Sequence, residues 1–446
     1  MMTWRQAKGC LWKGLMRGSG HRTSRRKGCH LSRRTLVQGG LAAVATGITV
    51  RAAAAEDQVL QALIQSEGTE FGQGFDSASR TIRMPKASLP TLSPSTVQTT
   101  EQAISQYEAI VARGGWPGVP PSELLRLGNR QPSIGALRQR LVATGDLDVK
   151  SGISEIFDSY VEAAVRRFQA RHGLIVDGLV REQTFNALNV PAATRLGQLK
   201  VNLVRLRSLS GNLGQRFVVC NLPAAQVEAI ENWVAVSRHV GVVGKPDRPS
   251  PDIQSKITEI NFNPFWTVPS SIVRRDLIPR MQQEPDYLTK NRIRIFDQHG
   301  SEVQPQQVNW YTEEAVNYQF KQDPGDFNSL GSIRINFPNP YSVYMHDTPF
   351  KNLFGEDFRF HSSGCVRVQN VRELVNWLLS DTPGWSRQEI DQVIKSGERK
   401  DAKLARAVPL YWVYVTAWAT PDGIVQFRED IYSRDGLGAV ATTNRG

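Results

Sequence analysis

The apolar positions divide the chain into a helical part followed by a part with strand-like alternation. Between residues 124 and 190, apolar side chains recur three and four positions apart, which places them on one face of a helix. The residues that carry this pattern are Ile134, Leu137, Leu141, Val161, Ala164, Val165, Phe168, Val180, Phe185 and Leu188. A turn signal at Asp177-Gly178 interrupts it. We therefore expect a compact helical unit at 124–190, followed by a connecting helix at 195–210.

From residue 216 onward, short runs of β-branched and aromatic residues alternate with Gly, Pro and Asn, which is typical of strands joined by turns. The predicted strands are 216–221, 240–243, 257–262, 292–296, 332–337, 342–346 and 413–419. The predicted helices are 269–290, 310–323 and 371–379. The segment between the strands near 262 and 332 is too long for a simple turn, so we expect a lid there. The predicted fold class is an α+β multidomain chain with a mainly-β catalytic domain at 216–430.

Charge is concentrated at the N-terminus. Residues 1–55 contain eleven Lys and Arg and no Asp or Glu, whereas the whole chain has a formal net charge of +12. Removing those eleven charges from the total of +12 leaves +1 for the remainder. A nearly neutral body argues against a nucleic-acid-binding face, although the sequence as a whole is basic.

The basic N-terminus has the organisation of an export signal. Ser32–Gln38 resembles the twin-arginine motif, the apolar stretch 39–50 follows it, and Ala52–Ala55 forms a small-residue cleavage site. The apolar stretch is shorter than the roughly 20 residues that span a bilayer. We predict a twin-arginine-like signal at 1–55, a periplasmic or cell-envelope location and membrane contact only during export. An uncleaved N-terminal anchor is the alternative.

The segment 56–115 is predicted to be an N-terminal scaffold that includes a linker. Residues 56–75 have a short helical pattern, and residues 76–100 are rich in Ser, Thr and Pro, the composition of a linker. Residues 101–113 are again helical in pattern and are followed by Gly114-Gly115-Trp116-Pro117-Gly118, which stops a helix.

Outside the leader, which holds Cys10 and Cys29, the chain has two cysteines. Two cysteines are too few for a disulfide framework, and we expect free thiols. Cys220 lies in an apolar run and is expected to be buried. Cys365 follows Ser362-Ser363-Gly364, where a tight turn can expose its sulfur. It is the predicted nucleophile.

A histidine partner precedes this cysteine by nineteen residues. His346 ends a strand-like run, and Asp347-Thr348-Pro349 stops the strand. His346 can take the proton of the Cys365 thiol, and the resulting imidazolium would stabilise the thiolate and lower the pKa of the thiol. Alternation places Tyr344 on the same face as His346, where it either orients the imidazole, lines the acyl pocket or only packs.

Two further groups can act on the reacting carbonyl. The backbone N–H groups of Gly364 and Cys365 are candidates for an oxyanion hole, because glycine permits a close approach. Arg367 is expected on the same face as Cys365, where it could bind a substrate carboxylate.

These motifs resemble a known family. His346–Pro349 and Ser363–Val368 are similar to the signature of the YkuD-type L,D-transpeptidases, and Asn263–Pro269 is similar to that family's N-P-x-W-x-x-P segment. The Ser-Ser-Gly-Cys variant and the N-terminal region resemble the YcbB-like branch. The sequence of residues 124–190 resembles the peptidoglycan-binding type 1 module. Four basic residues of this unit could bind an acidic ligand or could form a solvated helix face: Arg166, Arg167, Arg171 and His172.

One position departs from the family pattern. The usual histidine two residues before the cysteine is replaced by Ser363, and His361 lies four residues before Cys365. The resemblance assigns the base role to His346. It leaves His361 as a structural turn residue or a substrate contact, with Ser363 also on the substrate side.

The resemblance implies a concrete reaction. Cys365 would attack the carbonyl of the third residue of a peptidoglycan stem peptide, the terminal D-alanine would leave, and a side-chain amine of a neighbouring stem would resolve the thioester into a 3-3 cross-link. It also implies acylation by carbapenems. A wall-linked lipoprotein is a second acceptor that we keep open, and no cofactor is implied.

Three other functions use the same residues. Water as acceptor would give an L,D-carboxypeptidase or a cysteine wall hydrolase, and a degenerate domain would give a non-catalytic wall-binding protein. A zinc site of His346, His361 and Cys365 is disfavoured because the usual ligand spacings are missing, so we predict no metal. A glycine-rich phosphate loop is also missing, which disfavours a nucleotide cofactor.

Overall fold

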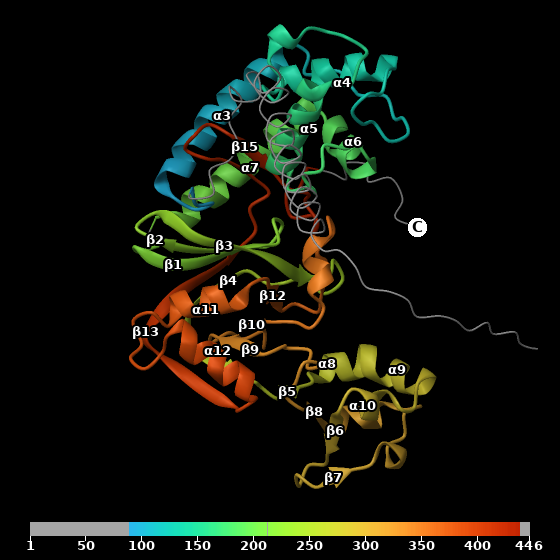
Figure 1. Ribbon diagram of the computed structural model, residues 1–446, viewed down its shortest axis with the longest axis vertical. Coiled ribbons are helices and arrows are strands. Elements are labelled where there is room, and N and C mark those ends of the chain that lie inside the picture. The colour runs from blue at the N-terminus through green and yellow to red at the C-terminus, as the bar shows by residue number, and fades with distance from the viewer. Residues whose placement is uncertain (1–88, 212, 438–446) are drawn as a thin grey trace, which may run out of the picture. The chain divides into compact units, whose positions relative to one another are not determined.

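The computed structural model describes residues 89–211 and 213–437 (Figure 1). The predicted export signal at 1–55, the helix at 56–75 and the linker up to residue 88 lie outside the described residues. Within the described part, no helix is both long and apolar enough to cross a membrane.

The first described helix is α3 (Pro94–Ala112), which begins inside the predicted linker. The Ser93 side chain accepts a hydrogen bond from the Thr96 N–H at 3.0 Å, and Pro94 occupies the first turn. Both residues favour a helix start. The linker prediction is therefore wrong from residue 94 onward, because the Ser and Pro content that suggested a linker belongs to a helix cap.

Residues 124–190 form the predicted helical unit. Its helices are α4 (Pro132–Ala143), α5 (Ser159–His172) and α6 (Glu182–Asn189). All the apolar residues that defined the helical pattern are buried in one core cluster. The helix α5 begins at the capping residue Asp158 and ends at Gly173, whose φ of +69° suits glycine. The predicted connecting helix is α7 (Ala192–Leu209), which packs with α3 and the hairpin β14–β15 (Ala417–Ala419 and Val425–Phe427).

The catalytic region is built on a nine-stranded sheet of described residues, in the order β11-β3-β12-β10-β9-β4-β13-β1-β2, and β2 also pairs with β3. The strands are β1 (Arg216–Asn221), β2 (Gln226–Glu231), β3 (Val234–Gly244), β4 (Ile253–Phe262), β9 (Ile333–Asn336), β10 (Met345–His346), β11 (Phe360–Ser362), β12 (Val366–Val368) and β13 (Lys400–Val413). The helices α11 (Val371–Leu378) and α12 (Arg387–Ser396) pack against its main core (Figure 1).

Residues 263–332 form an insertion with its own core, as the lid prediction requires. Its short sheet has the order β5-β8-β6-β7. The elements are β5 (Trp266–Thr267), α8 (Ser270–Ile272), the π-turn Val273–Leu277, α9 (Ile278–Gln283), α10 (Tyr287–Lys290), β6 (Ile293–Phe296), β7 (Glu302–Val303), the 3-10 turns Pro305–Gln307 and Glu313–Asn317, and β8 (Gln319–Gln322). Whether the insertion closes over a substrate stays a prediction.

Several sequence predictions fail within the catalytic region. The predicted strand 342–346 is reduced to Met345–His346, and the predicted helix 269–290 is broken between α9 and α10. The run 413–419 is not one strand, because β13 ends at Val413 and β14 belongs to another sheet. The run 310–323 is not a helix but a 3-10 turn followed by β8. The run 413–419 is short and apolar, so its periodicity does not separate one strand from two. The run 310–323 mixes apolar and charged residues, and pairing of β8 with β5 and β6 decides its strand.

Candidate active site

Strand register gathers the predicted catalytic residues on one face of the sheet. His346 in β10 lies opposite Arg334 of β9 and Arg367 of β12. Alternation predicts Tyr344 and Cys365 on this face. The intervening residues are completely buried in the core that contains α11: Met345, Val366 and Val368. The Tyr344 and His346 rings are in contact, as their predicted shared face requires. The shared face of Arg367 with Cys365 stays a prediction.

The turn that presents Cys365 is fixed by two serine hydroxyls. Ser362 Oγ donates to the Cys365 carbonyl at 2.6 Å and accepts from the Gly364 N–H at 3.2 Å. Ser250 Oγ donates to the Gly364 carbonyl at 2.8 Å. Gly364 has a φ of +114°, a conformation that other residues rarely adopt. The turn is therefore rigid before any substrate binds.

These contacts separate the two predicted oxyanion donors. The Gly364 N–H already donates to Ser362 Oγ. No acceptor for the Cys365 N–H occurs among the described residues. The geometry therefore favours Cys365 over Gly364 as the backbone donor to a developing oxyanion.

The orientation of His346 determines which nitrogen can act as a base. Its Nδ1 lies 2.5 Å from the carbonyl oxygen of Asp347. A carbonyl only accepts, so Nδ1 carries the proton and Nε2 keeps its lone pair. No hydrogen bond joins His346 to Cys365 within the described chain, a contact that can form when substrate binds.

The side chain of Asp347, to which sequence analysis gave no role, fixes this carbonyl. Its carboxylate accepts from both the N–H and the hydroxyl of Ser332, each at 3.1 Å, and pairs with Lys351. Asp347 thus connects His346 to the loop before β9. The sequence places Asp347 next to His346, but the register that brings Ser332 to it is not visible there.

Burial sets the charge state of the two catalytic side chains. It raises the pKa of the Cys365 thiol to about 11, although a hydrogen bond from the Tyr344 backbone and the charges of Arg334 and Arg367 oppose the rise. Burial, reinforced by Arg367, lowers the pKa of His346 to about 3. Cys365 keeps partial exposure, yet any rise in the pKa of its thiol leaves the sulfur protonated at neutral pH. These shifts favour the neutral form of both groups in the free protein. The thiolate–imidazolium pair stays a prediction.

Tyr344 joins several parts of the site. Its ring meets the His346 ring edge-on at 5.7 Å between centroids, and the Arg334 guanidinium lies 4.2 Å from its centroid. The Trp266 side chain hydrogen-bonds to its hydroxyl. Of the three roles kept open for Tyr344, contact with the imidazole is the one that these distances favour.

His361 and Ser363 lie away from the reacting atoms. His361 Nε2 contacts Glu356 Oε2 at 3.0 Å and the Phe358 carbonyl at 2.8 Å, which fits the structural role. Ser363 Oγ accepts from Arg248 at 3.0 Å, and Arg248 pairs with Asp276 of the insertion at 2.5 Å. In the described part of the chain, no group of three or more His, Cys, Asp or Glu side chains could hold a metal.

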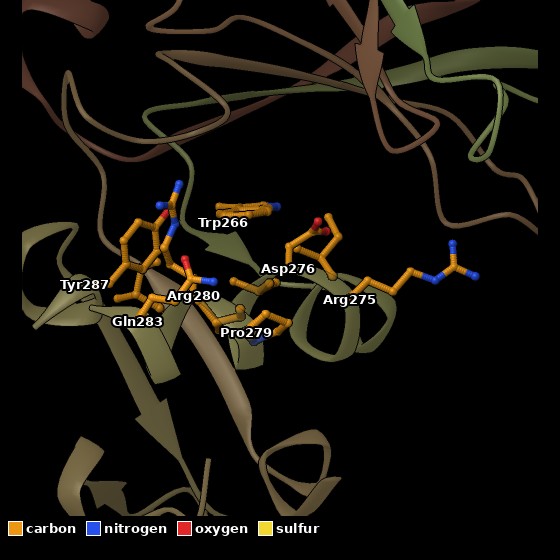
Figure 2. A pocket seen from close by; sticks show the side chains of 11 residues that line it. Trp266, Arg275, Asp276, Pro279, Arg280, Gln283 and Tyr287 are labelled. Carbon is orange, nitrogen blue, oxygen red and sulfur yellow. The ribbon is translucent and has the colours of Figure 1, made fainter. Parts of the chain in front are cut away.

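A cavity of about 320 Å³ lies in the insertion, and Figure 2 shows Trp266 on one side with Pro279 and Gln283 opposite. Arg275 extends away from the space. Trp266 packs against both the main core and the core of the insertion. Through Trp266 and its bond to Tyr344, the cavity is adjacent to the face that carries His346.

The candidate ligand residues of the helical unit are mostly internal. Arg171 pairs with Asp146 in a buried contact at 2.5 Å. His172 stacks on Phe168 with 3.8 Å between centroids, and burial lowers its pKa well below the usual value. Arg171 and His172 thus contribute to the packing of the unit, and they are not open to a ligand.

Comparison with known proteins identifies two regions of the chain. Residues 215–388 match the family described as "L,D-transpeptidase catalytic domain" (YkuD), and residues 130–188 match the "Putative peptidoglycan binding domain" family. A "Putative L,D-transpeptidase" of Haemophilus influenzae is 31% identical over 239 residues, which cover 53% of this chain and 48% of that protein. The chain therefore spans about half the length of this curated relative.

Other matches cover smaller regions or diverge further in sequence. The "N-acetylmuramoyl-L-alanine amidase CwlM" of Mycobacterium tuberculosis is 40% identical over 83 residues, 17% of this chain and 20% of that protein. A solved L,D-transpeptidase from Stackebrandtia nassauensis is 11% identical and covers 67% of this chain and 96% of its own, with a TM-score of 0.24. One from Xylanimonas cellulosilytica is 16% identical and covers 66% and 99%, with a TM-score of 0.22.

Proposed function

Because the chain carries a YkuD-type L,D-transpeptidase catalytic domain and a peptidoglycan-binding domain, we propose that it joins peptidoglycan stem peptides by 3-3 cross-links through a thioester on Cys365. The observation that supports this proposal most strongly is the register of β10 with β12, which pairs His346 with Arg367, two residues after Cys365. The match to a peptidoglycan-acting family indicates a location in the cell envelope. Export by the twin-arginine route and membership of the YcbB-like branch stay predictions.

The first half of the reaction follows from the neutral state of both catalytic groups. As the sulfur of Cys365 attacks the stem-peptide carbonyl, Nε2 of His346 takes the thiol proton, since Nδ1 is committed to Asp347. The Cys365 N–H donates to the developing oxyanion. The imidazolium then gives its proton to the amine of the departing D-alanine, and the acyl group remains on sulfur.

In the second half, a nucleophile releases the acyl group from Cys365. The side-chain amine of a neighbouring stem loses its proton to Nε2 of His346 and attacks the thioester, which yields the cross-link and restores the thiol. A wall-linked lipoprotein amine would react in the same way. Water would instead release a free tripeptide, so the acceptor decides between transpeptidase and carboxypeptidase activity.

The test is product analysis by mass spectrometry after incubation with a disaccharide tetrapeptide. We expect dimers with a 3-3 bond from the wild type, none from Cys365→Ala, and a rate about 10²–10⁴-fold lower from His346→Ala, the usual contribution of a general base. Cys220→Ala is the matched control, because that thiol is buried in the core. Dimers from Cys365→Ala would refute the proposal, and tripeptide without dimers would identify a carboxypeptidase.

A further inference from the structure

Two arginines lie beside the catalytic pair without an anionic partner. Arg334 and Arg367 occupy the strands on either side of β10, each opposite His346. Their Nε atoms are buried and unbonded, and neither guanidinium forms an ion pair within the residues that the structure describes. Other buried arginines have partners within the protein. Arg138 and Arg171 pair with carboxylates, whereas Arg140 and Arg195 donate to carbonyl, hydroxyl or amide oxygens.

An unpaired, partly desolvated cation is costly, so its position requires an explanation. Burial lowers the pKa of Arg367, and the neighbouring Cys365 thiol carries no charge at pH 7 that could offset it. Two carboxylates on the neighbouring strand segments are engaged elsewhere. Asp347 is held by Ser332 and Lys351, and Glu259 accepts from two asparagine side chains, those of Asn261 and Asn336. The described part of the chain therefore offers these two arginines no carboxylate partner.

The two guanidinium groups differ in how they are held. Arg334 lies over the Tyr344 ring at 4.2 Å, a stacking contact that fixes its plane. Arg367 has a more distant aromatic neighbour, with 6.0 Å to the Phe350 centroid, and Phe350 is exposed. Arg334 is thus the better ordered of the two. A planar guanidinium group with a fixed orientation is suited to bidentate binding of a carboxylate.

We propose that Arg334 acts with Arg367 to bind a carboxylate of the acyl donor beside the scissile carbonyl. The inference rests on the proposed function and specifies the donor as a peptide with a free carboxylate within one residue of the bond that breaks. The carboxylate of the leaving residue meets this requirement, and so does a side-chain carboxylate of the third residue in stems where that residue is a diamino diacid. Arg334 was not among the residues assigned from sequence.

The first test needs no wall substrate. In a Cys220→Ala background, Cys365 is alkylated with anionic iodoacetate and with neutral iodoacetamide, and the ratio of the two rates is compared with that of free cysteine. We expect the ratio to be about 10-fold above that of free cysteine and to fall about 10-fold in Arg334→Met. Taking a ratio cancels any change in thiol ionisation. Arg399→Met is the control, because Arg399 also lies over an aromatic ring, Phe265 at 5.9 Å, but is exposed.

Arg334→Lys provides a second variant that keeps the charge, and it should retain part of the preference because an ammonium lacks the planar fork. A ratio equal to that of free cysteine, or one that Arg334→Met leaves unchanged, overturns the inference. Neither outcome depends on transpeptidase activity, so failure of this inference is distinguishable from failure of the proposed function.

The second test identifies which carboxylate is bound. The value of kcat/KM is measured with the free donor, with a donor amidated at the leaving residue and with one amidated at the diamino acid. Arg334→Met should lower kcat/KM about 10- to 100-fold with the free donor. It should lower kcat/KM less than about 2-fold with the donor whose bound carboxylate has been amidated. An equal loss on all three donors contradicts carboxylate binding by Arg334.

Discussion

Replacing Gly331 with Ala should disturb His346 through Asp347. A Cβ at Gly331 would lie 2.5 Å from Asp347 Oδ2 and 2.6 Å from Cγ, which is too close for any real contact. The carboxylate has no free position to move to, because the Ser332 N–H and hydroxyl and the Lys351 ammonium hold it. Either the carboxylate leaves this position or the loop before β9 shifts.

The expected cost has two parts. A φ of +58° at Gly331 costs about 1 kcal/mol for alanine. Displacing the carboxylate breaks two hydrogen bonds from Ser332, each worth about 1.5–3 kcal/mol when the acceptor is charged, although new contacts with water recover part of this. The exposed Lys351 adds little. We expect a total loss of about 3–5 kcal/mol in the free energy of unfolding.

Gly300→Ala is the matched control. Gly300 has a φ of +82°, and nothing lies within 4 Å of the point that an alanine Cβ would occupy, so it carries only the conformational cost of about 1 kcal/mol. Urea unfolding of both variants isolates the displacement of Asp347. Thioester formation on Cys365 should slow about 10- to 100-fold in Gly331→Ala alone, because the imidazole loses its fixed Nδ1 acceptor. Equal destabilisation with unchanged acylation in both variants would refute the positioning role of Asp347.

Three further predictions follow from burial and charge. In a Cys220→Ala background, iodoacetamide alkylation of Cys365 should be slow at pH 7 and rise with pH toward about 11; a plateau below pH 8 would contradict the neutral thiol. Burial lowers the pKa of His346 from 6.5 to about 3. The stability that the neutral imidazole contributes is therefore complete above pH 6.5 and is lost as the pH falls toward 3. The His346→Gln variant should lose less stability than the wild type between pH 6.5 and pH 3, measured by urea unfolding. Arg171→Met should cost about 3–5 kcal/mol by urea unfolding because it leaves the buried Asp146 unpaired, and adding Asp146→Asn should restore part of the loss; additive losses would argue against the pair.

The helical unit could be predicted well because its signal is local. Residues spaced three and four apart in α4 and α5 are buried together, so periodicity and packing agree. The strand β1 was predicted with its observed bounds, Arg216–Asn221, because its four central residues are apolar and it is buried on both faces. The long strand β13 was missed because its first half is rich in charged residues and Pro409 lies within it. Its strand conformation is decided by pairing with β4 and β1, which the sequence does not reveal.

The sequence could identify those site residues that belong to local motifs or to an alternating strand pattern. Alternation could pair His346 with Tyr344, and Cys365 with Arg367, because each pair belongs to a short strand-like motif. Arg334 and Ser250 could not be placed in this way, since neither belongs to those motifs and only the pairing of distant segments brings them to the site. The long separation in sequence between these segments is what a local pattern cannot bridge.

Burial of the catalytic pair also changes the expected order of events. Sequence proximity of a cysteine and a histidine suggests an ion pair, but the charge state depends on how far both groups are removed from water. Arg334 and Arg367 favour the thiolate of Cys365 but do not outweigh its burial. A donor carboxylate bound by these arginines would weaken even this assistance. Proton transfer to His346 therefore has to accompany the attack on the carbonyl, so the orientation of the imidazole, fixed by Asp347, controls the rate more than the acidity of the free thiol does.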